Sequence, residues 1–300
     1  IKYAVRSLLP DLVDRPPEEL LERLPEWTED SFAGILLNVA AGRVANRFDF
    51  GGVNFAVDAA CGSSLAAVFA SARELTSGAS DMVVTGGVDT VQSPFGFMCF
   101  SSSQALSPSG RCAPFDAQAD GIAISEGIGL VVLKRLADAE RDGDRIYAVI
   151  RGVAGSSDGR GRSMTAPRPE GQVLAMRRAY DQAGFPPSSV TLIEAHGTGT
   201  VAGDEAEVGS LTRLFSADGA EPRSCALGSV KSMLGHTKAA AGMAGLIKVA
   251  LAIYHKTLPP TINVNRPNPK LADPSSPVFV STEAQPWLRP APDTPRRAGV

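Results

Sequence analysis

The sequence predicts an α/β fold, and three observations lead to that class. Short runs rich in β-branched residues alternate with helices rich in small residues, an order typical of layered sheets and helices. One helix near the end of the chain is apolar on nearly every side, and two distant segments repeat the same strand, turn and helix. The runs predicted as strands are residues 53–59, 81–87, 129–136, 145–155 and 191–195, and helices are predicted from about Ser63, from Gln172, after Asp204 and from about Thr237.

The first of these helices follows the strand-like run VNFAVDA. Its apolar residues recur at helical spacing, as at Leu65, Val68 and Leu75, and Gly78 is placed to end it. The helix from about Thr237, KAAAGMAGLIKVALAIY, has no polar face, so we expect it to lie buried between layers.

Both helices follow a strand and a glycine-containing turn, AVDAACGSSLAA in one case and ALGSVKSMLGHTKAAAG in the other. This likeness predicts a distant internal duplication. The acidic stretch ADAERDGDR, residues 137–145, holds few apolar groups that could carry a core across it. We therefore expect an N-terminal half over residues 1–142 and a C-terminal half over residues 143–300.

Charge and apolar content argue against several kinds of partner. The chain carries 29 basic and 32 acidic residues without a basic stripe, so we expect no nucleic-acid or anionic-membrane partner. No apolar run approaches the roughly 20 residues of a membrane-spanning helix, and the first residues lack the order of a signal peptide. Cys61, Cys99, Cys112 and Cys225 stand singly, which favours reduced thiols. These features predict a cytoplasmic protein without a membrane span.

Cys61 is the candidate nucleophile. It lies in DAACGSS, where the predicted strand turns into the predicted helix, so its sulfur would face the first N–H groups of that helix. Those dipoles favour the thiolate, which is the reactive form of cysteine. Gly62 permits close backbone approach, and the N–H groups of the turn could also receive a developing oxyanion. A buried, unreactive cysteine is the competing interpretation of this segment.

Two of the three histidines lie beside glycines, His196 in EAHGTGT and His236 in MLGHTKAAAG. Such loops hold functional groups more often than core histidines. Together with Cys61 these residues predict a joint catalytic site, whereas His255 is interpreted as structural. Two other sites use the same residue types: a Cys-His-His metal site, for which no ligand pair has short regular spacing, and the site of a cysteine hydrolase. We expect no metal.

Three segments together resemble the catalytic blocks of the β-ketoacyl synthases: DAACGSSLAA, EAHGTGTVAGDEAE and GSVKSMLGHTKAAAG. GRCAPFDAQADGIAISEG and LPPTINVNRPNP also resemble that family, so the likeness extends over nearly the whole chain. The resemblance implies a thiolase-like fold, layered αβαβα with two duplicated halves, normally as a homodimer. It also implies that residues 91–100 approach the dimer interface and an acyl tunnel.

By this resemblance, Cys61 takes an acyl chain from a thioester, and His196 and His236 stabilise the enolate that forms when a malonyl-type extender loses carbon dioxide. The product would be a β-ketoacyl thioester of polyketide or fatty acid biosynthesis. The resemblance implies no intrinsic cofactor, because the substrates are carried on the phosphopantetheine of an acyl carrier protein.

Four further residues match supporting positions of the family. Lys231 matches a lysine that supports the site electrostatically, and Glu207 matches its carboxylate partner. Thr198 and Thr200 match positions that bind the phosphopantetheine arm. Each of the four could, from its own segment alone, be a surface charge or a turn residue.

Departures from the family pattern indicate which kind of synthase the chain comes from. The chain begins without methionine, lacks the family's first segment and stops at RRAGV, before the glycine-rich block that supplies a second oxyanion N–H and a gating phenylalanine. We therefore interpret it as a fragment of a type I polyketide or polyunsaturated-fatty-acid-like synthase. Met233 replaces a common asparagine and DAACGSS replaces DTACSSS, which favours iterative enzymes of the polyunsaturated fatty acid, glycolipid or enediyne kind.

Two other functions stay open at this point. A non-decarboxylating thiolase or acyltransferase relative would also use Cys61, although two histidines plus Lys231 argue against the usual thiolase set. A non-catalytic chain-length or scaffold partner typically lacks the cysteine that this chain retains.

Overall fold

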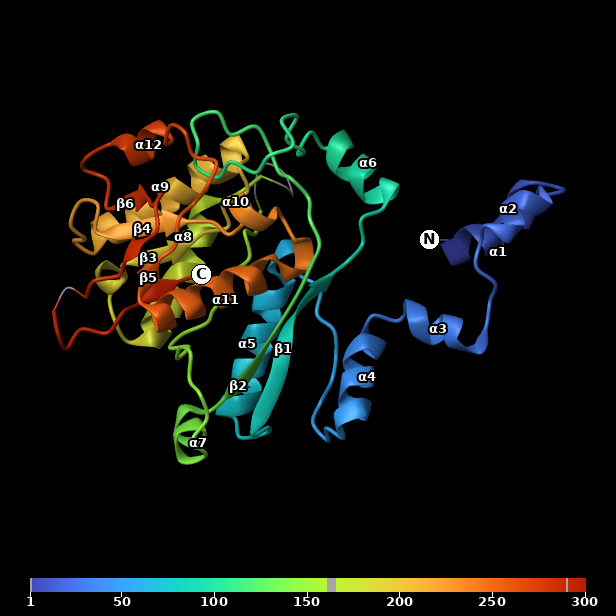
Figure 1. The fold of residues 1–300 in the computed structure, drawn as a ribbon, viewed down its shortest axis with the longest axis horizontal. Helices are drawn as coiled ribbons and strands as arrows, with labels where there is room; N and C mark the ends of the chain where they lie inside the picture. The colour runs from blue at the N-terminus through green and yellow to red at the C-terminus, as the bar shows by residue number, and fades with distance from the viewer. Residues whose placement is uncertain (1, 161–165, 290) are drawn as a thin grey trace. The chain divides into compact units, whose positions relative to one another are not determined.

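The computed structural model describes residues 2–160, 166–289 and 291–300, which form two compact units, residues 1–56 and 57–300 (Figure 1). In the first unit Thr28 begins a helix, because its side chain and that of Ser31 cap one another's backbone N–H groups. The helices of this unit are α1 (Lys2–Leu12), α2 (Glu18–Glu22), α3 (Glu29–Ile35) and α4 (Asn38–Phe48).

The second unit is built around a parallel sheet of four strands in the order β6-β4-β3-β8. Neighbouring residues of one strand point to opposite faces, as a pleated strand requires. Ile193 and Leu227 enter one hydrophobic cluster, while Leu192 and Ala226 enter another. The strands are β3 (Leu192–Glu194), β4 (Cys225–Gly228), β6 (Val278–Val280) and β8 (Ala298–Gly299).

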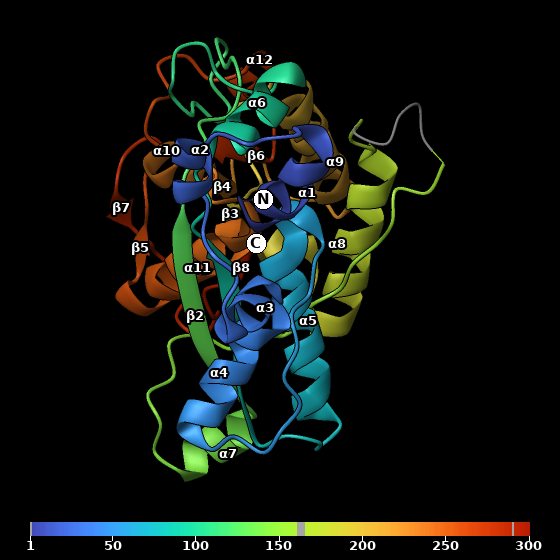
Figure 2. The same ribbon diagram turned by 90° about the vertical axis from the view of Figure 1, so that its right-hand side faces the viewer.

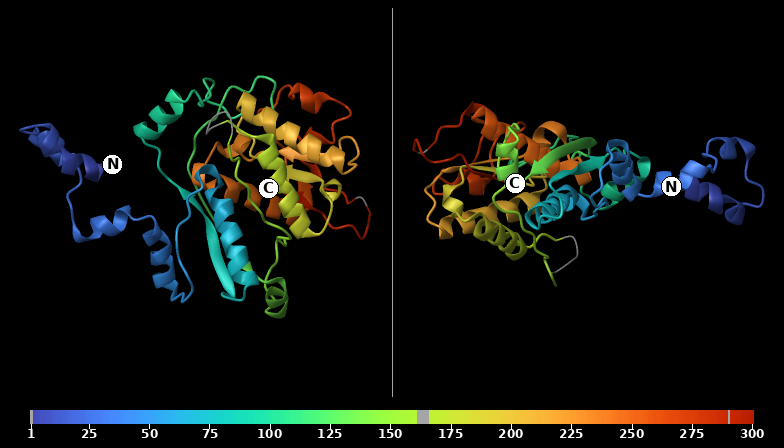
Figure 3. Two further views of the ribbon diagram at one scale, coloured as in Figure 1. Left: turned by 180° about the vertical axis from the view of Figure 1, so that it is seen from behind. Right: turned by 90° about the horizontal axis from the view of Figure 1, so that it is seen from below.

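Helices cover both faces of this sheet. On one face α8 (Pro169–Ala183) and α9 (Val201–Ala217) lie side by side, and Val173 and Leu211 fill the space beneath them (Figure 3). On the other face Val249 of α11 (Ala241–His255) packs against the sheet together with Trp287. The sheet therefore lies between two helical layers.

A second, antiparallel sheet lies beyond α11. It consists of β1 (Met82–Asp89) and β2 (Gly127–Lys134), and both strands pack against α11 and against α5 (Ser63–Thr76) (Figures 1 and 2). The unit thus shows the successive layers α8/α9, parallel sheet, α5/α11 and antiparallel β1–β2 sheet. The prediction that the apolar helix after Thr237 is central is confirmed.

The two central helices begin in the same way. A 3-10 turn, η1 (Ala60–Gly62), precedes α5, and a second, η3 (Lys238–Ala240), precedes α11. The first residue of each turn has a left-handed backbone, with φ of 49° at Ala60 and 51° at Lys238. The turns pack against one another, and a Cβ on Gly87 of β1 would lie 2.8 Å or less from atoms at the starts of both helices. This correspondence agrees with the predicted duplication.

Several sequence predictions hold to within a few residues. The helix predicted from Ser63 begins there and is followed by Gly78 in the left-handed conformation. The helices predicted from Gln172 and after Asp204 begin three and four residues earlier than expected, at Pro169 and Val201.

Two predicted strands are wrong. Residues 53–59 and 145–155 belong to no strand or sheet in the described part of the chain. β-branched residues favour extended backbone, but a strand also requires a neighbouring strand with free N–H and C=O groups. Residues 150–153 run against α8 instead, where the N–H of Val153 donates to Gln182 and a Cβ on Gly152 would lie 2.2 Å from the carbonyl oxygen of Ala179.

The remaining elements are short or peripheral. In the described residues, none of the helices is both long and apolar enough to cross a membrane. The remaining elements are α6 (Pro94–Ser102), α7 (Leu136–Arg141), η2 (Pro187–Ser189), α10 (Lys231–Leu234), α12 (Pro269–Ala272), β5 (Thr257–Leu258) and β7 (Gln285–Pro286).

Candidate active site

Cys61 occupies the middle of the 3-10 turn η1, and polar contacts fix that turn. Asp58 Oδ1 accepts a hydrogen bond from the N–H of Ala60 at 2.9 Å. Ser63 Oγ accepts one from the N–H of Ala59 at 2.9 Å and donates one to the carbonyl of Ala60 at 2.7 Å. These contacts hold the left-handed backbone before the cysteine, so its position is set by the chain on both sides.

The thiol of Cys61 is half-buried, and burial raises its pKa. Three charges act on it in addition: Lys231 and Lys238 lower its pKa, and Asp89 raises it. The N–H of Cys61 itself also favours the thiolate, whereas the N–H of Gly62 is bonded to the carbonyl of Ala59. The start of α5 alone therefore does not activate the thiol, and nearby cations must oppose the effect of burial.

His236 lies two residues before the first residue of the second turn, η3, and is 3% exposed. Its main chain pairs with a neighbouring segment: its N–H donates to the carbonyl of Ala123 at 2.7 Å, and its carbonyl accepts from the N–H of Ser125 at 3.0 Å. Its ring Nδ1 accepts a hydrogen bond from the N–H of Lys238 at 2.9 Å. In the neutral ring the proton is therefore on Nε2, which is left as a hydrogen-bond donor.

His196 lies beyond the end of β3, and Glu207 of α9 holds its loop. The two carboxylate oxygens accept hydrogen bonds from the N–H groups of His196 at 2.7 Å and Gly197 at 2.8 Å. Gly197 has φ of 40°, and a Cβ there would lie 2.6 Å from the Cβ of Ser229, so glycine is required at this position. The rings of His196 and His236 lie edge to face, with centroids 5.5 Å apart and planes at 85°.

The two histidines are neutral at physiological pH. Burial is the largest influence on each, and the charge of Lys231 adds to it. The pKa of His196 falls to about 4, although the residue as a whole is solvent-exposed, and that of the buried His236 falls to about 3. Neutral imidazoles can donate a hydrogen bond to an anion without transferring a proton readily.

Lys231 begins α10 beyond the end of β4, next to the strand that leads to His196. Because β3 and β4 are parallel, their carboxyl ends meet at one edge of the sheet. Lys231 is 3% exposed, and burial lowers its pKa, while the charge of Glu194 is the largest influence that raises it. Glu207 also raises the pKa of Lys231 but forms no ion pair with it within 4.0 Å.

The two threonines lie in the loop that continues from His196. Their hydroxyl oxygens are 2.9 Å apart, and Thr200 precedes the first residue of α9. The carbonyl of Thr198 accepts a hydrogen bond from the thiol of Cys112 at 3.3 Å. The structure therefore places both threonines at the start of the helix that carries Glu207.

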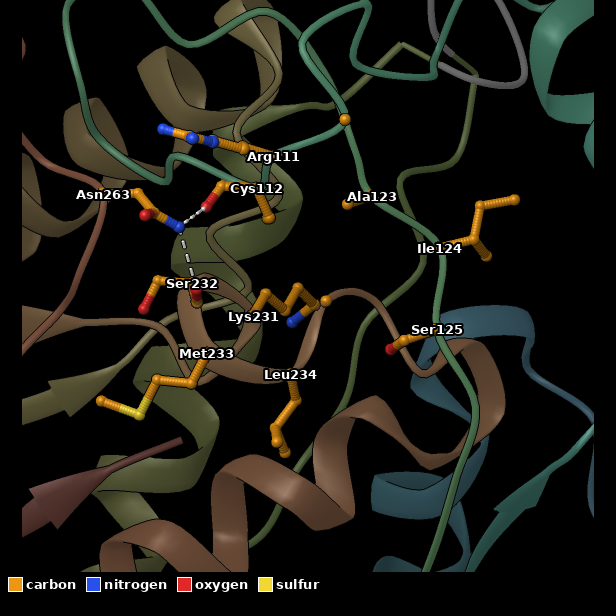
Figure 4. Close-up of a pocket in the computed structure, with 12 residues that line it drawn as sticks. Arg111, Cys112, Ala123, Ile124, Ser125, Lys231, Ser232, Met233, Leu234 and Asn263 are labelled. Atoms are coloured by element: carbon orange, nitrogen blue, oxygen red, sulfur yellow. Dashed lines mark hydrogen bonds between the residues drawn. The ribbon is translucent and has the colours of Figure 1, made fainter.

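A cavity of about 260 Å³ opens beside Lys231 (Figure 4). Asn263 lies at its wall, where its side-chain Nδ2 donates to the carbonyls of Cys112 and Ser232 at 3.0 Å each. Arg111 and Met233 also line it, so the cavity combines cationic, polar and apolar groups. Among the described residues, no three His, Cys, Asp or Glu side chains are grouped as a metal site would require.

Sequence reasoning missed two buried carboxylates that shape this site. Asp204 is 2% exposed and accepts hydrogen bonds from the N–H groups of Phe115 at 2.7 Å and Gly199 at 3.1 Å. Glu194 is 3% exposed, accepts from the N–H of Val230 and pairs with Lys248 at 2.7 Å. An acidic residue that ends an apolar strand, as in TLIEA, was the available signal for Glu194.

Comparison with known proteins matches two stretches of the chain to family models. Residues 18–139 match the family described as beta-ketoacyl synthase, N-terminal domain, and residues 147–265 match beta-ketoacyl synthase, C-terminal domain. A polyunsaturated fatty acid synthase subunit of Thraustochytrium sp. is 47% identical over 289 residues, which cover 94% of this chain and 10% of that protein. A phenolphthiocerol/phthiocerol polyketide synthase subunit of Mycobacterium tuberculosis is 46% identical over 262 residues, covering 87% of this chain and 14% of that protein.

Solved structures show the same likeness. The ketosynthase from module 6 of the bacillaene synthase from Bacillus subtilis 168 aligns with a TM-score of 0.86 and 38% identity. The alignment covers 91% of this chain and 50% of that one, so the chain spans about half the length of this neighbour. The likeness confirms the thiolase-like fold that the sequence motifs implied.

Proposed function

Because the chain belongs to the beta-ketoacyl synthase family, we propose that it carries the site of a decarboxylative Claisen condensation in polyketide or fatty acid biosynthesis. The observation that carries this proposal is the meeting of two helix starts. The turn of Cys61 packs against the turn that follows His236, and the ring of His236 meets that of His196. A nucleophile and two neutral imidazoles thus share one site.

The first step is acyl transfer to Cys61. The sulfur attacks the carbonyl carbon of an acyl thioester, a new C–S bond forms, and the carrier leaves as its free thiol after taking up the proton. Lys231 favours this step because its charge opposes the rise in the pKa of Cys61 that burial causes. Sulfur suits both this step and the last one, since it is a good nucleophile and a good leaving group.

The second step is loss of carbon dioxide from a malonyl-type extender thioester. The bond to the carboxylate breaks, and its electron pair forms an enolate whose charge lies largely on the thioester oxygen. The Nε2–H of His236 can donate to that oxygen, because Nδ1 is already occupied by the N–H of Lys238. His196, also neutral, is the second donor that we propose.

The third step forms the new carbon–carbon bond. The enolate carbon attacks the Cys61 thioester, the C–S bond breaks, and Cys61 leaves as a thiolate that is then reprotonated. The product is a β-ketoacyl thioester on the extender's carrier. Lys231 and Glu207 support the site electrostatically in this proposal, and Glu207 also fixes the main chain of His196.

We also propose the partners of this reaction. Acyl and malonyl thioesters would arrive on the phosphopantetheine of an acyl carrier protein, which Thr198 and Thr200 would bind, and the domain would work as a cytoplasmic homodimer. The four unpaired cysteines agree with a reducing compartment. The similar identities to the Thraustochytrium and Mycobacterium relatives leave the synthase class open between polyunsaturated fatty acid and polyketide products.

Intact-mass analysis tests the nucleophile. The protein is incubated with an acyl thioester of an acyl carrier protein, and we expect one acyl adduct on the wild type and none on Cys61→Ala. Cys99→Ser is the matched control, because Cys99 is an exposed free cysteine of the same chain, and it should retain the adduct. An adduct that persists in Cys61→Ala would refute the assignment, and loss in both variants would point to misfolding.

A further inference from the structure

Lys238 has a backbone conformation that its residue type does not favour. Its φ of 51° is left-handed, which costs a non-glycine residue free energy unless its surroundings hold it. The equivalent residue of the other turn is Ala60, whose N–H is held by the carboxylate of Asp58. At the second turn the N–H of Lys238 is held by the ring of His236 in the same two-residue relation. The lysine, unlike the alanine, has a side chain that can add contacts.

That side chain joins three segments. Its Nζ lies 3.0 Å from Oδ1 of Asp89, the last residue of β1, and donates to the carbonyl of Ser125 at 2.9 Å. The side chains of Lys238 and Asp89 are each only 17% exposed, so solvent screens this ion pair less than a surface pair. Ser125 belongs to the segment whose main chain pairs with His236. We call Asp89, Lys238 and the Ser125 carbonyl the lysine clamp.

The lysine clamp acts on His236 through the backbone. It ties the turn to β1 and to the segment beside His236, and so keeps the Lys238 N–H directed at Nδ1. This hydrogen bond decides which ring nitrogen of neutral His236 carries the proton. If the turn relaxed to an ordinary backbone conformation, Nδ1 would lose its donor and either nitrogen could carry the proton.

The same ion pair also faces Cys61. The charged groups that act on the thiol are Lys231 of α10, Lys238 of η3 and Asp89 of β1. Because Lys238 and Asp89 have opposite charges, their effects on the pKa of Cys61 oppose one another while both are present. Removing either one leaves the other uncompensated.

We propose that Lys238 is a positioning residue of this site, which holds His236 in one tautomer and orientation through its contacts with Asp89 and Ser125. The inference rests on the proposed condensation only for its kinetic consequence. The effect on the ring of His236 is a property of the folded chain and can be measured without substrate.

Nitrogen NMR of the histidine-labelled chain tests the geometry. The chain has three histidines, and His236→Gln identifies the signals of His236. We expect the wild type to show a single neutral tautomer with the proton on Nε2, and Lys238→Met and Asp89→Asn to show averaged tautomers. Lys256→Met is the matched control, because Lys256 is also left-handed, with φ of 57°, but is exposed at the end of α11. An unchanged His236 in both clamp variants would overturn the proposal.

Kinetics separate the clamp from general destabilisation. Decarboxylation of a malonyl thioester should fall about tenfold or more in Lys238→Met and in Asp89→Asn, as expected for losing one hydrogen bond, and Lys238→Arg should recover most of it. The pH at which Cys61 reacts with iodoacetamide should rise in Lys238→Met and fall in Asp89→Asn. A merely structural defect would shift the pH of the iodoacetamide reaction in the same direction in both variants, and that result would overturn the proposal.

The two proposals can fail separately. A wild-type chain with the single His236 tautomer but no decarboxylation would contradict the condensation and support the clamp. Full decarboxylation by a wild-type chain whose His236 shows averaged tautomers would support the condensation and contradict the clamp.

Discussion

Glu207→Gln is the change that most directly tests how the site is held. The carboxylate accepts hydrogen bonds from two successive main-chain N–H groups, those of His196 and Gly197. Glutamine keeps the shape of the side chain but replaces one acceptor oxygen with an NH₂ group, which would face an N–H. The variant therefore removes one hydrogen bond without opening a cavity.

The expected magnitude follows from that bond. A hydrogen bond to a charged group contributes about 1.5–3 kcal/mol. Each 1.4 kcal/mol corresponds to a factor of ten, so the equilibrium constant that favours the ordered position of the loop should fall roughly ten- to a hundredfold. Decarboxylation should fall by a similar factor, whereas acylation of Cys61 should change little, because other contacts hold its turn.

The pKa of Glu207 gives this prediction a pH dependence. Burial raises that pKa to about 7, so lowering the pH from 8 to 6 protonates the carboxyl of the wild type and weakens its acceptance. The difference between wild type and Glu207→Gln should therefore be largest near pH 8 and should shrink toward pH 6. The assay is malonyl-thioester decarboxylation across this range, together with the free energy of unfolding of both proteins.

Glu205→Gln is the matched control on the same helix. Glu205 is 54% exposed in its side chain and pairs with the exposed Lys270 at 2.8 Å, a contact that contributes little to stability. It should leave decarboxylation within about twofold of the wild type. If Glu207→Gln behaves like this control at pH 8, the two carboxylate contacts do not hold His196 and our account of the loop is refuted.

Two further predictions concern stability. The pKa values of His196 and His236 lie near 4 and 3 in the folded chain and near 6.5 when unfolded, so the unfolded state binds more protons as the pH falls below 6.5 and the fold loses stability down to about pH 4. The buried carboxyls with raised pKa values act in the opposite direction, so the test compares the wild type with the double variant His196→Gln/His236→Gln. Between pH 7 and 4.5 the urea midpoint of the double variant should fall less than that of the wild type. Parallel curves of urea midpoint against pH would contradict the prediction. Gly152→Ala should lower the free energy of unfolding by about 1–3 kcal/mol, because its Cβ would lie 2.2 Å from a carbonyl oxygen of α8. Gly155→Ala has open space around its Cβ and should stay within about 0.5 kcal/mol of the wild type in denaturant unfolding, and equal effects would refute the packing argument.

The parts of the fold that the sequence predicted well are those whose signal is local. The helix at Ser63 has apolar spacing, a turn before it and Gly78 after it, and all three signals are close together along the chain. The all-round apolar helix after Thr237 could only be buried, and it lies between two sheets. The prediction of a strand over residues 145–155 failed because β-propensity reports only a preference for extended backbone. Whether a neighbouring strand is present to pair with it depends on the tertiary structure.

The candidate site divides in the same way. Cys61, His196 and His236 could be found because their residue types are scarce and their glycine-rich surroundings are distinctive. Asp204 and the lysine clamp could not be found in this way, because each contacts a segment far away in the sequence. Asp204 accepts a hydrogen bond from the N–H of Phe115, and Lys238 pairs with Asp89. No local pattern marks a carboxylate whose partner is 89 residues away.

The differing exposure of the cysteines has a practical consequence for covalent inhibitors. Cys99 on α6 is exposed, whereas Cys61 is half-buried with a raised pKa. A small electrophile that selects thiols by access would therefore modify Cys99 of the single chain before Cys61. A warhead aimed at the nucleophile must gain its selectivity from non-covalent contacts that hold it beside the turn of Cys61, and Cys99→Ser is the background in which such compounds should be ranked.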